Sequence, residues 1–176
     1  MTCQEFAELI ETEGREIYRF CCHLTGEKDG ADELYQETML KAMGRLSRIE
    51  LSNNPKSFLL GIAVKIWKGK RRKYARRQRI APEESLDQMT AGMELVGLED
   101  SPEEAYLSKE LCELVRRETA LLKENYRIPV YLYYSAQMDI EEIAALLHIP
   151  KGTVKSRLHT ARTTIAEKLK EYGYEA

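Results

Sequence analysis

The sequence predicts an all-α protein, with two small helical domains joined by an acidic flexible linker. Apolar residues recur at intervals of three and four in both halves of the chain, as expected for helices. Every charged residue from Glu83 to Glu104 is acidic. Residues 140–158 have the pattern of a helix-turn-helix. The expected boundaries are 1–80 for the N-terminal domain, 81–101 for the linker and 102–176 for the C-terminal domain.

The N-terminal domain is expected to begin with two helices separated by a short turn. Thr2 and Glu5 have the spacing of a capping box, in which each side chain bonds to the other residue's backbone N–H, so a helix is expected to start here. A turn is expected over the glycine-containing residues 26–30. The second helix is expected to carry an apolar stripe that extends from Ala31 to Leu46.

A third helix is expected to carry the positive charge of this domain. The Ser-Asn-Asn-Pro sequence at 52–55 breaks the second helix, and the third is expected to begin near Phe58. From Lys65 to Arg79 every charged residue is basic, although the net charge of the chain is −2. Such a segment is typical of contact with a polyanion. Trp67 lies within it, and we expect this side chain to be buried in the core rather than stacked on a base.

The C-terminal domain is expected to begin with a long helix and a short one. Ser-Pro-Glu-Glu at 101–104 is typical of a helix start, and this helix is expected to run to about Leu122. The shorter helix is expected over residues 126–134. Pro129 is expected in its first turn, because a proline further along would remove a backbone hydrogen bond.

The strongest motif is the helix-turn-helix from Ile140 to Leu158. Asp139 and Glu142 form a second capping box before its first helix, which is expected to end at Leu147. Its turn is expected at 148–150, with histidine at position 148 where glycine is common, and its second helix over Gly152 to Leu169. We expect three apolar side chains of the second helix to turn inward: Val154, Leu158 and Ala161.

That arrangement leaves a polar outer face on the second helix, made of Lys155, Ser156, Arg157, His159 and Arg162. In a helix-turn-helix protein this helix enters the major groove, where lysine and arginine donate to guanine or phosphate and serine or histidine can also donate. A helical hairpin with solvated cations is the alternative interpretation of the motif alone.

The rest of the composition gives no indication of secretion, membrane insertion or catalysis. The longest apolar run, residues 128–134, is shorter than the roughly 20 residues that cross a bilayer, and no basic-then-apolar leader is present, so a cytoplasmic protein is expected. The four cysteines lack CxxC spacing and are expected to be buried thiols: Cys3, Cys21, Cys22 and Cys112. The three histidines fall on different elements, and no nucleophile has a base beside it. We therefore expect no enzyme, cofactor, metal or small-molecule substrate.

Two separate segments also carry a family resemblance. One is Gly-Thr-Val-Lys-Ser-Arg-Leu at 152–158, preceded by Ile-Glu-Glu-Ile-Ala at 140–144. The other is the sequence from Asp32 to Ala42, followed by Phe58–Ala63 and the basic run. Together they resemble the extracytoplasmic-function (ECF) sigma factors of the sigma-70 family, RNA polymerase subunits that direct transcription initiation at promoters.

The resemblance implies three binding surfaces and the partners core RNA polymerase, promoter DNA and an anti-sigma factor. The expected polymerase-binding residues are Asp32, Glu33, Gln36, Glu37, Leu40 and Lys41. The start-proximal promoter element is expected to contact Asn53, Asn54, Lys56, Phe58, Lys65, Lys68, Arg71, Arg72 and Arg76. The upstream element is expected to contact Thr153, Lys155, Ser156, Arg157, His159, Thr160 and Arg162.

Two other function classes compete with this prediction. A free-standing helix-turn-helix transcriptional regulator would use its N-terminal half to sense a ligand or to dimerise. That class explains the C-terminal domain, but it leaves the acidic surface around Leu40 and the basic third helix unexplained. A nucleic-acid-processing enzyme would need a metal or nucleophile cluster that the sequence does not offer.

Overall fold

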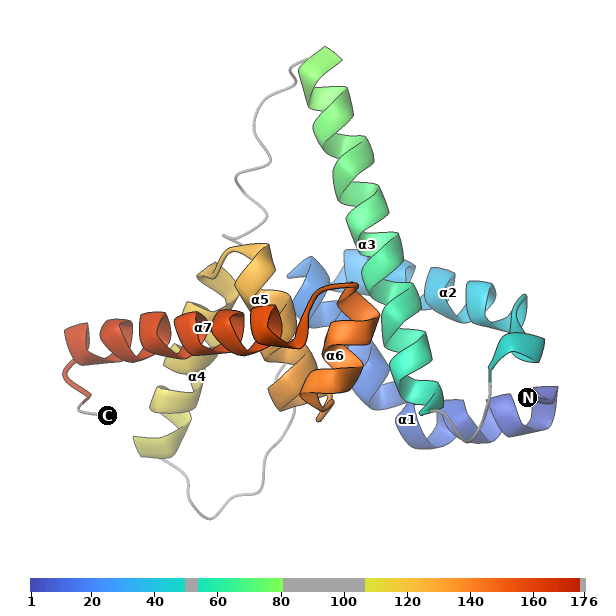
Figure 1. The fold of residues 1–176 in the computed structure, drawn as a ribbon, viewed down its shortest axis with the longest axis horizontal. Helices are drawn as coiled ribbons and strands as arrows, with labels where there is room; N and C mark the ends of the chain where they lie inside the picture. The colour runs from blue at the N-terminus through green and yellow to red at the C-terminus, as the bar shows by residue number, and fades with distance from the viewer. Residues whose placement is uncertain (50–53, 81–106, 175–176) are drawn as a thin grey trace.

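The computed structural model describes residues 1–49, 54–80 and 107–174, and these residues form helices joined by short turns (Figure 1). The helices are α1 (Cys3–Thr25), α2 (Lys28–Met43), η1 (Leu46–Arg48), α3 (Pro55–Ile80), α4 (Leu107–Leu121), α5 (Glu124–Val130), η3 (Tyr131–Ser135), α6 (Ile140–Leu147) and α7 (Lys151–Glu171). The predicted all-α fold is confirmed. The predicted linker and the helix start at 101–104 lie outside the described residues.

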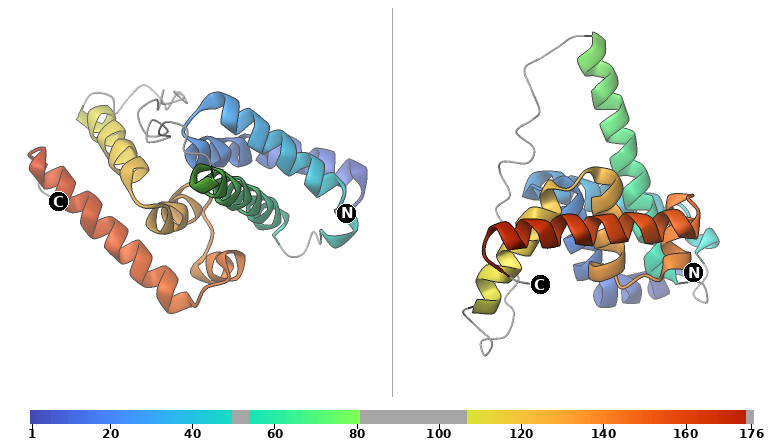
Figure 2. Two further views of the ribbon diagram at one scale, coloured as in Figure 1. Left: turned by 90° about the horizontal axis from the view of Figure 1, so that it is seen from above. Right: turned by 60° about the vertical axis from the view of Figure 1, so that its left-hand side comes forward.

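The first three α-helices pack against one another as the N-terminal domain (Figure 2). The predicted capping box starts α1, since Thr2 Oγ1 accepts from the Glu5 N–H at 3.2 Å and Glu5 Oε2 accepts from the Thr2 N–H at 2.7 Å. The inner faces of the helices bury Ile17, Phe20 and Leu34, which are at most 1% exposed. This apolar core fixes the outer faces of α2 and α3.

The second helix is shifted from its predicted position. Only Gly26 and Glu27 separate α1 from α2, because Gly26 adopts the left-handed region with φ 76° and the Thr25 hydroxyl donates to the Glu27 carbonyl at 2.9 Å. The turn predicted over 26–30 is therefore too long. The prediction was also wrong for Leu46, which lies in η1 and not in α2, because the chain turns after Gly44.

The third helix begins at Pro55, three residues before the predicted Phe58, and its C-terminal half projects away from the other helices (Figure 1). Its first half packs into the domain, where Leu59 and Leu60 are fully buried. Trp67 is 6% exposed, so the prediction that it belongs to the core is confirmed. The projecting half carries most of the basic residues of this helix.

In the C-terminal domain the prediction for Pro129 was wrong. This proline lies in the last turn of α5 and not in the first. Its ring is fully buried, its neighbours Ile128 and Val130 are also buried, and this burial offsets the backbone hydrogen bond that it cannot donate. The chain then continues as the π-helical turn η3, which closes with a 3.0 Å bond from the Ala136 N–H to the Tyr131 carbonyl.

The helix-turn-helix is formed by α6 and α7. Its predicted capping box is confirmed, with the Glu142 N–H donating to Asp139 Oδ1 at 2.7 Å and the Asp139 N–H donating to Glu142 Oε2 at 2.9 Å. His148 ends α6 in the left-handed region, with φ 55° and ψ 47°. Val154, Leu158 and Ala161 are buried as predicted and orient the opposite side of α7 outward.

Of the four cysteines predicted to be buried, only Cys21 is fully buried. This burial, with the neighbouring Cys22, raises the pKa of the Cys21 thiol to about 12. Cys22 is partly buried, whereas Cys3 and Cys112 are exposed on the outer sides of α1 and α4. Across the described parts of the chain, no helix has the length and apolar character needed to span a membrane.

Candidate nucleic-acid interfaces and protein-binding surface

The outer face of α7 presents most of the predicted upstream-element residues together. Exposed side chains are Lys155, Ser156, His159, Thr160 and Arg162, while Thr153 and Arg157 are partly buried. The Ser156 hydroxyl donates to the Thr153 carbonyl at 3.1 Å, which leaves its oxygen able to accept a further bond. The first acidic residue of this helix is Glu167, beyond the outer face. The face therefore offers several donors to base edges and phosphates.

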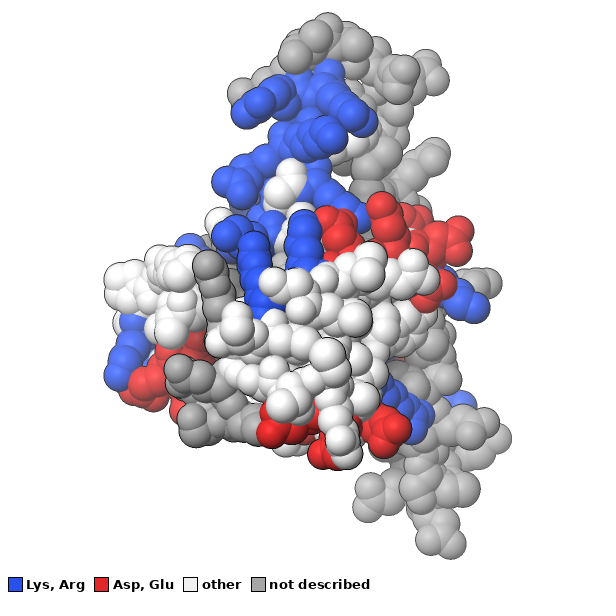
Figure 3. Space-filling model, turned by 90° about the vertical axis from the view of Figure 1, so that its right-hand side faces the viewer, with Lys and Arg blue, Asp and Glu red and all other residues white. Residues whose placement is uncertain are grey.

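The second basic surface follows α3, which contains no acidic residue along its length. Four of the predicted DNA-binding cations are exposed, Lys65, Arg71, Arg72 and Arg76, and Lys68 is partly buried. Figure 3 shows lysine and arginine side chains gathered on the projecting part of the molecule. Arg71 also lies over the Trp67 ring, with its guanidinium carbon 5.8 Å from the centroid. The spacing of charges suits contacts with successive phosphates of a nucleic acid.

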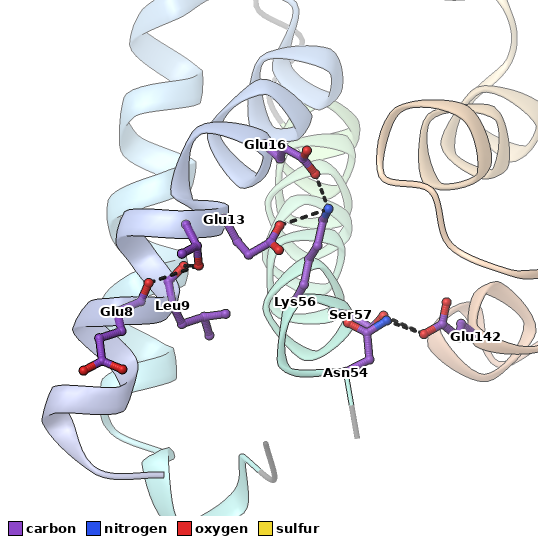
Figure 4. Close-up of polar contacts among 9 residues, drawn as sticks. Glu8, Leu9, Glu13, Glu16, Asn54, Lys56, Ser57 and Glu142 are labelled. Carbon is purple, nitrogen blue, oxygen red and sulfur yellow. Dashed lines mark hydrogen bonds and ion pairs between the residues drawn. The ribbon is translucent and has the colours of Figure 1, made fainter. Parts of the chain in front are cut away.

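At the start of α3, the predicted DNA-binding residues point in different directions (Figure 4). Asn54 and Ser57 face α6, whereas Lys56 reaches to Glu13 and Glu16 of α1. Burial lowers the pKa of Lys56, but its bonds to the two glutamates outweigh that effect and raise the pKa above its ordinary value.

Phe58 and Asn53 are the remaining residues predicted to bind the start-proximal element near the beginning of α3. Phe58 is partly buried and packs against the core, so only part of its ring is available to a base. Asn53 lies outside the described residues.

The predicted protein-binding residues all lie on α2, with an apolar centre. Leu40 is 69% exposed. Glu33, Gln36 and Lys41 are exposed around it, and Glu37 is partly buried. Asp32 is more enclosed, because its carboxylate accepts a 2.6 Å bond from the Tyr18 hydroxyl. An exposed leucine bordered by charged groups is a feature of protein-binding surfaces.

Ion pairs hold the carboxylates of this surface in place. Lys41 contacts Glu37 at 2.6 Å, and Lys70 of α3 contacts Glu33 at 3.0 Å and Glu37 at 3.2 Å. The bond from Lys41 lowers the pKa of the Glu37 carboxyl, and Lys70 adds to this effect against partial burial. The Glu37 carboxyl is therefore ionised near neutral pH, and the ion pairs to Lys70 connect α2 to the basic helix.

The sequence prediction missed three residues at these surfaces. Met43 is 54% exposed one turn after Leu40, and its i+3 spacing from Leu40 is a signal that could have identified it. Lys70 belongs to the basic run but is not among the predicted site residues, because its pairing with α2 depends on the packing of two helices. Ser57 joins Asn54 only because α6 lies nearby, which no local pattern indicates.

Both halves of the chain match models of the same protein family. Residues 9–79 match sigma-70 region 2, and residues 112–165 match sigma-70 region 4. The first match contains α2 and nearly all of α3, and the second contains the helix-turn-helix. The two basic helices therefore lie in two separate regions of the same family.

Individual relatives agree with this assignment. The ECF RNA polymerase sigma factor SigW of Bacillus subtilis is 26% identical over 173 residues, which cover 94% of this chain and 89% of the relative. SigE of Mycolicibacterium smegmatis is 24% identical over 96% of this chain and 63% of its own length. The fold is similar to that of the sigma factor RpoE from Bartonella quintana, solved in complex with the anti-sigma factor NepR, with a TM-score of 0.75, 22% identity and coverage of 95% of this chain and 98% of that one. The chain belongs to the ECF group of the sigma-70 family and is thus a non-catalytic RNA polymerase subunit that directs transcription initiation.

Proposed function

We propose that the chain divides promoter recognition between its two domains. The outer face of α7 contacts the upstream promoter element as duplex DNA, while α3 and the residues before it contact the start-proximal element. The boundaries that go with this proposal are 1–80 and 102–176 for the two domains, with residues 81–101 as the connection between them. Core polymerase is bound mainly through α2.

The upstream assignment is supported by α7, which has a buried apolar side and an exposed polar side. Val154 and Leu158 are at most 4% exposed, while Lys155, Ser156 and His159 project from the opposite side. The donors on this side include groups that distinguish bases, as well as cations that bind phosphate. We therefore assign sequence readout to this helix.

The start-proximal assignment depends on charge and on the position of Asn54 at the beginning of α3. Promoter opening requires unpaired bases and their phosphates to be held after they leave the duplex stack. The cations of α3 supply contacts to the backbone, and the residues at 52–56 form the proposed pocket for an unstacked base. Of these residues, 52 and 53 lie outside the described residues.

The polymerase assignment depends on Leu40 and Met43, which together form an exposed apolar pair within the acidic surface of α2. Burial of these two side chains on a partner would contribute about 1.5–3 kcal/mol each. The flanking carboxylates would favour a cationic partner surface and disfavour other partners.

We further propose that an anti-sigma factor restrains this chain by covering the same α2 surface. The support for this proposal is the structural similarity to an RpoE sigma factor that was solved with the anti-sigma factor NepR. A cytoplasmic location follows from the proposed interaction with RNA polymerase and DNA.

A reconstitution with purified components tests the proposed function. Promoters are first identified by mapping transcription start sites after overexpression of the chain. Core polymerase and this chain, without any other sigma factor, are expected to produce transcripts from those start sites. A free-standing regulator would give transcripts only after another sigma factor is added, and that result would contradict the proposal.

A further inference from the structure

The two domains contact each other along one side of α3 and also between α1 and η3, and we refer to the contacts along α3 as the domain seam. Its polar part joins Asn54 and Ser57 to Glu142 of α6. Its apolar part places Gly61 of α3 against the Leu146 side chain. Its third part is an ion pair at 3.6 Å between Arg71 Nε and Glu124 Oε2 of α5. The seam therefore uses carboxylates from the C-terminal domain and donors from the N-terminal domain.

Glu142 is held in position for this contact by the start of its own helix. Its Oε2 atom accepts from the Asp139 N–H at 2.9 Å, as part of the capping box. Its Oε1 atom accepts from Asn54 Nδ2 and, at 3.3 Å, from the Ser57 hydroxyl. Figure 4 shows both donors directed toward Glu142. The capping box thus leaves one carboxylate oxygen available for the other domain.

The donors in the seam belong to the proposed start-proximal DNA surface. Asn54 and Arg71 are both residues that we assign to this promoter contact, and both bind a carboxylate here. A carboxylate oxygen offers acceptors similar to those of a phosphate or a base carbonyl. The upstream face of α7 remains exposed at the same time. The contact between the domains thus occupies two residues of one DNA surface, Asn54 and Arg71, and leaves the other DNA surface accessible.

We propose that Glu142, assisted by Glu124, is an internal competitor for the start-proximal DNA contact. This inference rests on the proposed DNA contact of Asn54 and Arg71. In the free chain, the two carboxylates occupy donors that single-stranded promoter DNA needs. Binding of single-stranded DNA at these donors requires the domain seam to open. The competition lowers the affinity of the free chain for single-stranded DNA without changing the upstream recognition face.

A matched pair of substitutions tests this proposal in the full chain. Glu142→Gln removes the carboxylate from the seam but keeps a carbonyl oxygen for the capping box. Glu141→Gln removes the same charge from the adjacent residue, whose carboxylate pairs with Lys151 inside the C-terminal domain. Affinity for fluorescent single-stranded DNA of mixed sequence is measured by anisotropy, and the radius of gyration by small-angle X-ray scattering.

Glu142→Gln is expected to tighten DNA binding by about three- to tenfold, because it removes one charged hydrogen-bonding group from the closed state. Its radius of gyration is expected to increase. Glu141→Gln is expected to change affinity by less than about twofold, since it removes the same charge and an exposed ion pair with Lys151 but no contact of the seam. Equal changes in affinity for the two variants would overturn the competitor role, whether or not the radius of gyration changed.

A second variant opens the seam without changing charge. Within 4 Å, a Cβ atom at Gly61 would meet only the Leu146 side chain, at 3.7 Å, so a longer side chain there is directed at the other domain. Gly61→Gln is expected to increase both the radius of gyration and the affinity for DNA. An opened chain with unchanged affinity would overturn the proposal.

The proposed function is tested separately in the Glu142→Gln background. Addition of Asn54→Ala and Arg71→Ala is expected to weaken DNA binding there by about tenfold, if each group contributes to the contact. If the added substitutions change nothing, the start-proximal assignment of these residues is wrong, while the scattering data still report whether the seam opens.

Discussion

Single residues in this protein connect local helix geometry to the contact between domains. Glu142 uses one oxygen to start α6 and the other to bind Asn54 and Ser57. His23 of α1 stacks on Tyr131 of η3 in the other domain, with ring centroids 4.3 Å apart and planes inclined by 14°. The stacking contact depends on the ionisation state of His23, and this dependence makes it accessible to experiment.

His148 provides a test of backbone strain at the turn of the helix-turn-helix. It is exposed and has φ 55°, a conformation that costs a non-glycine residue about 1–2 kcal/mol. His148→Gly is expected to raise the free energy of unfolding by about 1 kcal/mol, after the greater flexibility of glycine in the unfolded chain is included. Urea unfolding followed by circular dichroism measures this change. Ala145→Gly on the exposed side of α6 is the control, expected to destabilise by about 1 kcal/mol. Destabilisation by both variants would contradict the account.

His23 predicts a pH dependence of stability. Burial, with smaller effects from Arg19 and Arg116, lowers the pKa of His23 from 6.5 to about 4. The unfolded chain therefore binds a proton at higher pH than the folded chain does. The contribution of this residue to stability is present above pH 6.5 and is lost as the pH falls toward about 4.

Unfolding of the wild type and of His23→Phe across this range isolates the effect, because phenylalanine keeps a ring against Tyr131 without a titrating group. The variant is expected to lose less stability on acidification. His159→Gln, on the exposed face of α7, is the control and is expected to follow the wild type. Identical pH profiles for wild type and His23→Phe would show that the titration of His23 does not affect stability.

At the scale of helices, the sequence predicted features that local interactions determine. Both capping boxes and the inward-facing positions of α7 could be recognised because they depend on residues within one or two turns. The position of Pro129 could not be predicted in this way, since burial of its ring in the domain core decides it. Leu46 was misplaced for a similar reason, because the chain leaves α2 at Gly44 before the apolar stripe ends.

For the candidate sites, the sequence predicted which side chains face outward but not which distant residues they contact. The outward positions of Lys155 and Leu40 follow from helical periodicity. The bond from Asn54 to Glu142 joins residues 88 positions apart, and no periodic pattern relates them. The same is true of Lys56, whose partners lie on α1. Contacts of this kind require knowledge of how helices pack.

The protein-binding surface of α2 can be tested by a double substitution. Glu37→Lys combined with Leu40→Asp reverses a charge and removes the exposed apolar centre, so the affinity for core polymerase is expected to fall by at least about a hundredfold. Both residues lie outside the core, and the helical content is expected to stay unchanged. The control makes the same types of change on α4, with Glu113→Lys and Leu121→Asp, at two exposed positions. Native-like helicity together with unchanged affinity for polymerase would remove α2 from the proposed interface.

At the scale of the whole molecule, the two basic helices belong to different domains and have different chemical character. The outer face of α7 mixes cations with serine, threonine and histidine. The projecting part of α3 is dense in lysine and arginine, with few polar groups able to distinguish bases. A low net charge of −2 is compatible with both surfaces because acidic residues are concentrated elsewhere in the chain. The central claim is that α7 selects the promoter and α3 supplies affinity.

The most direct test compares Lys155→Ala and Arg76→Ala, two exposed cations on the two helices. Holoenzyme binding is measured on matched and mutated promoters over a series of salt concentrations. Lys155→Ala is expected to reduce the binding free energy at the preferred upstream sequence by about 1–3 kcal/mol. It is also expected to weaken the discrimination between bases at one position of that sequence. Arg76→Ala is expected to weaken binding to all promoters alike. It is also expected to reduce the slope of log affinity against log salt concentration by about one, which corresponds to one counterion fewer released. The opposite result, with Arg76→Ala changing promoter preference and Lys155→Ala weakening all promoters equally, would contradict the central claim.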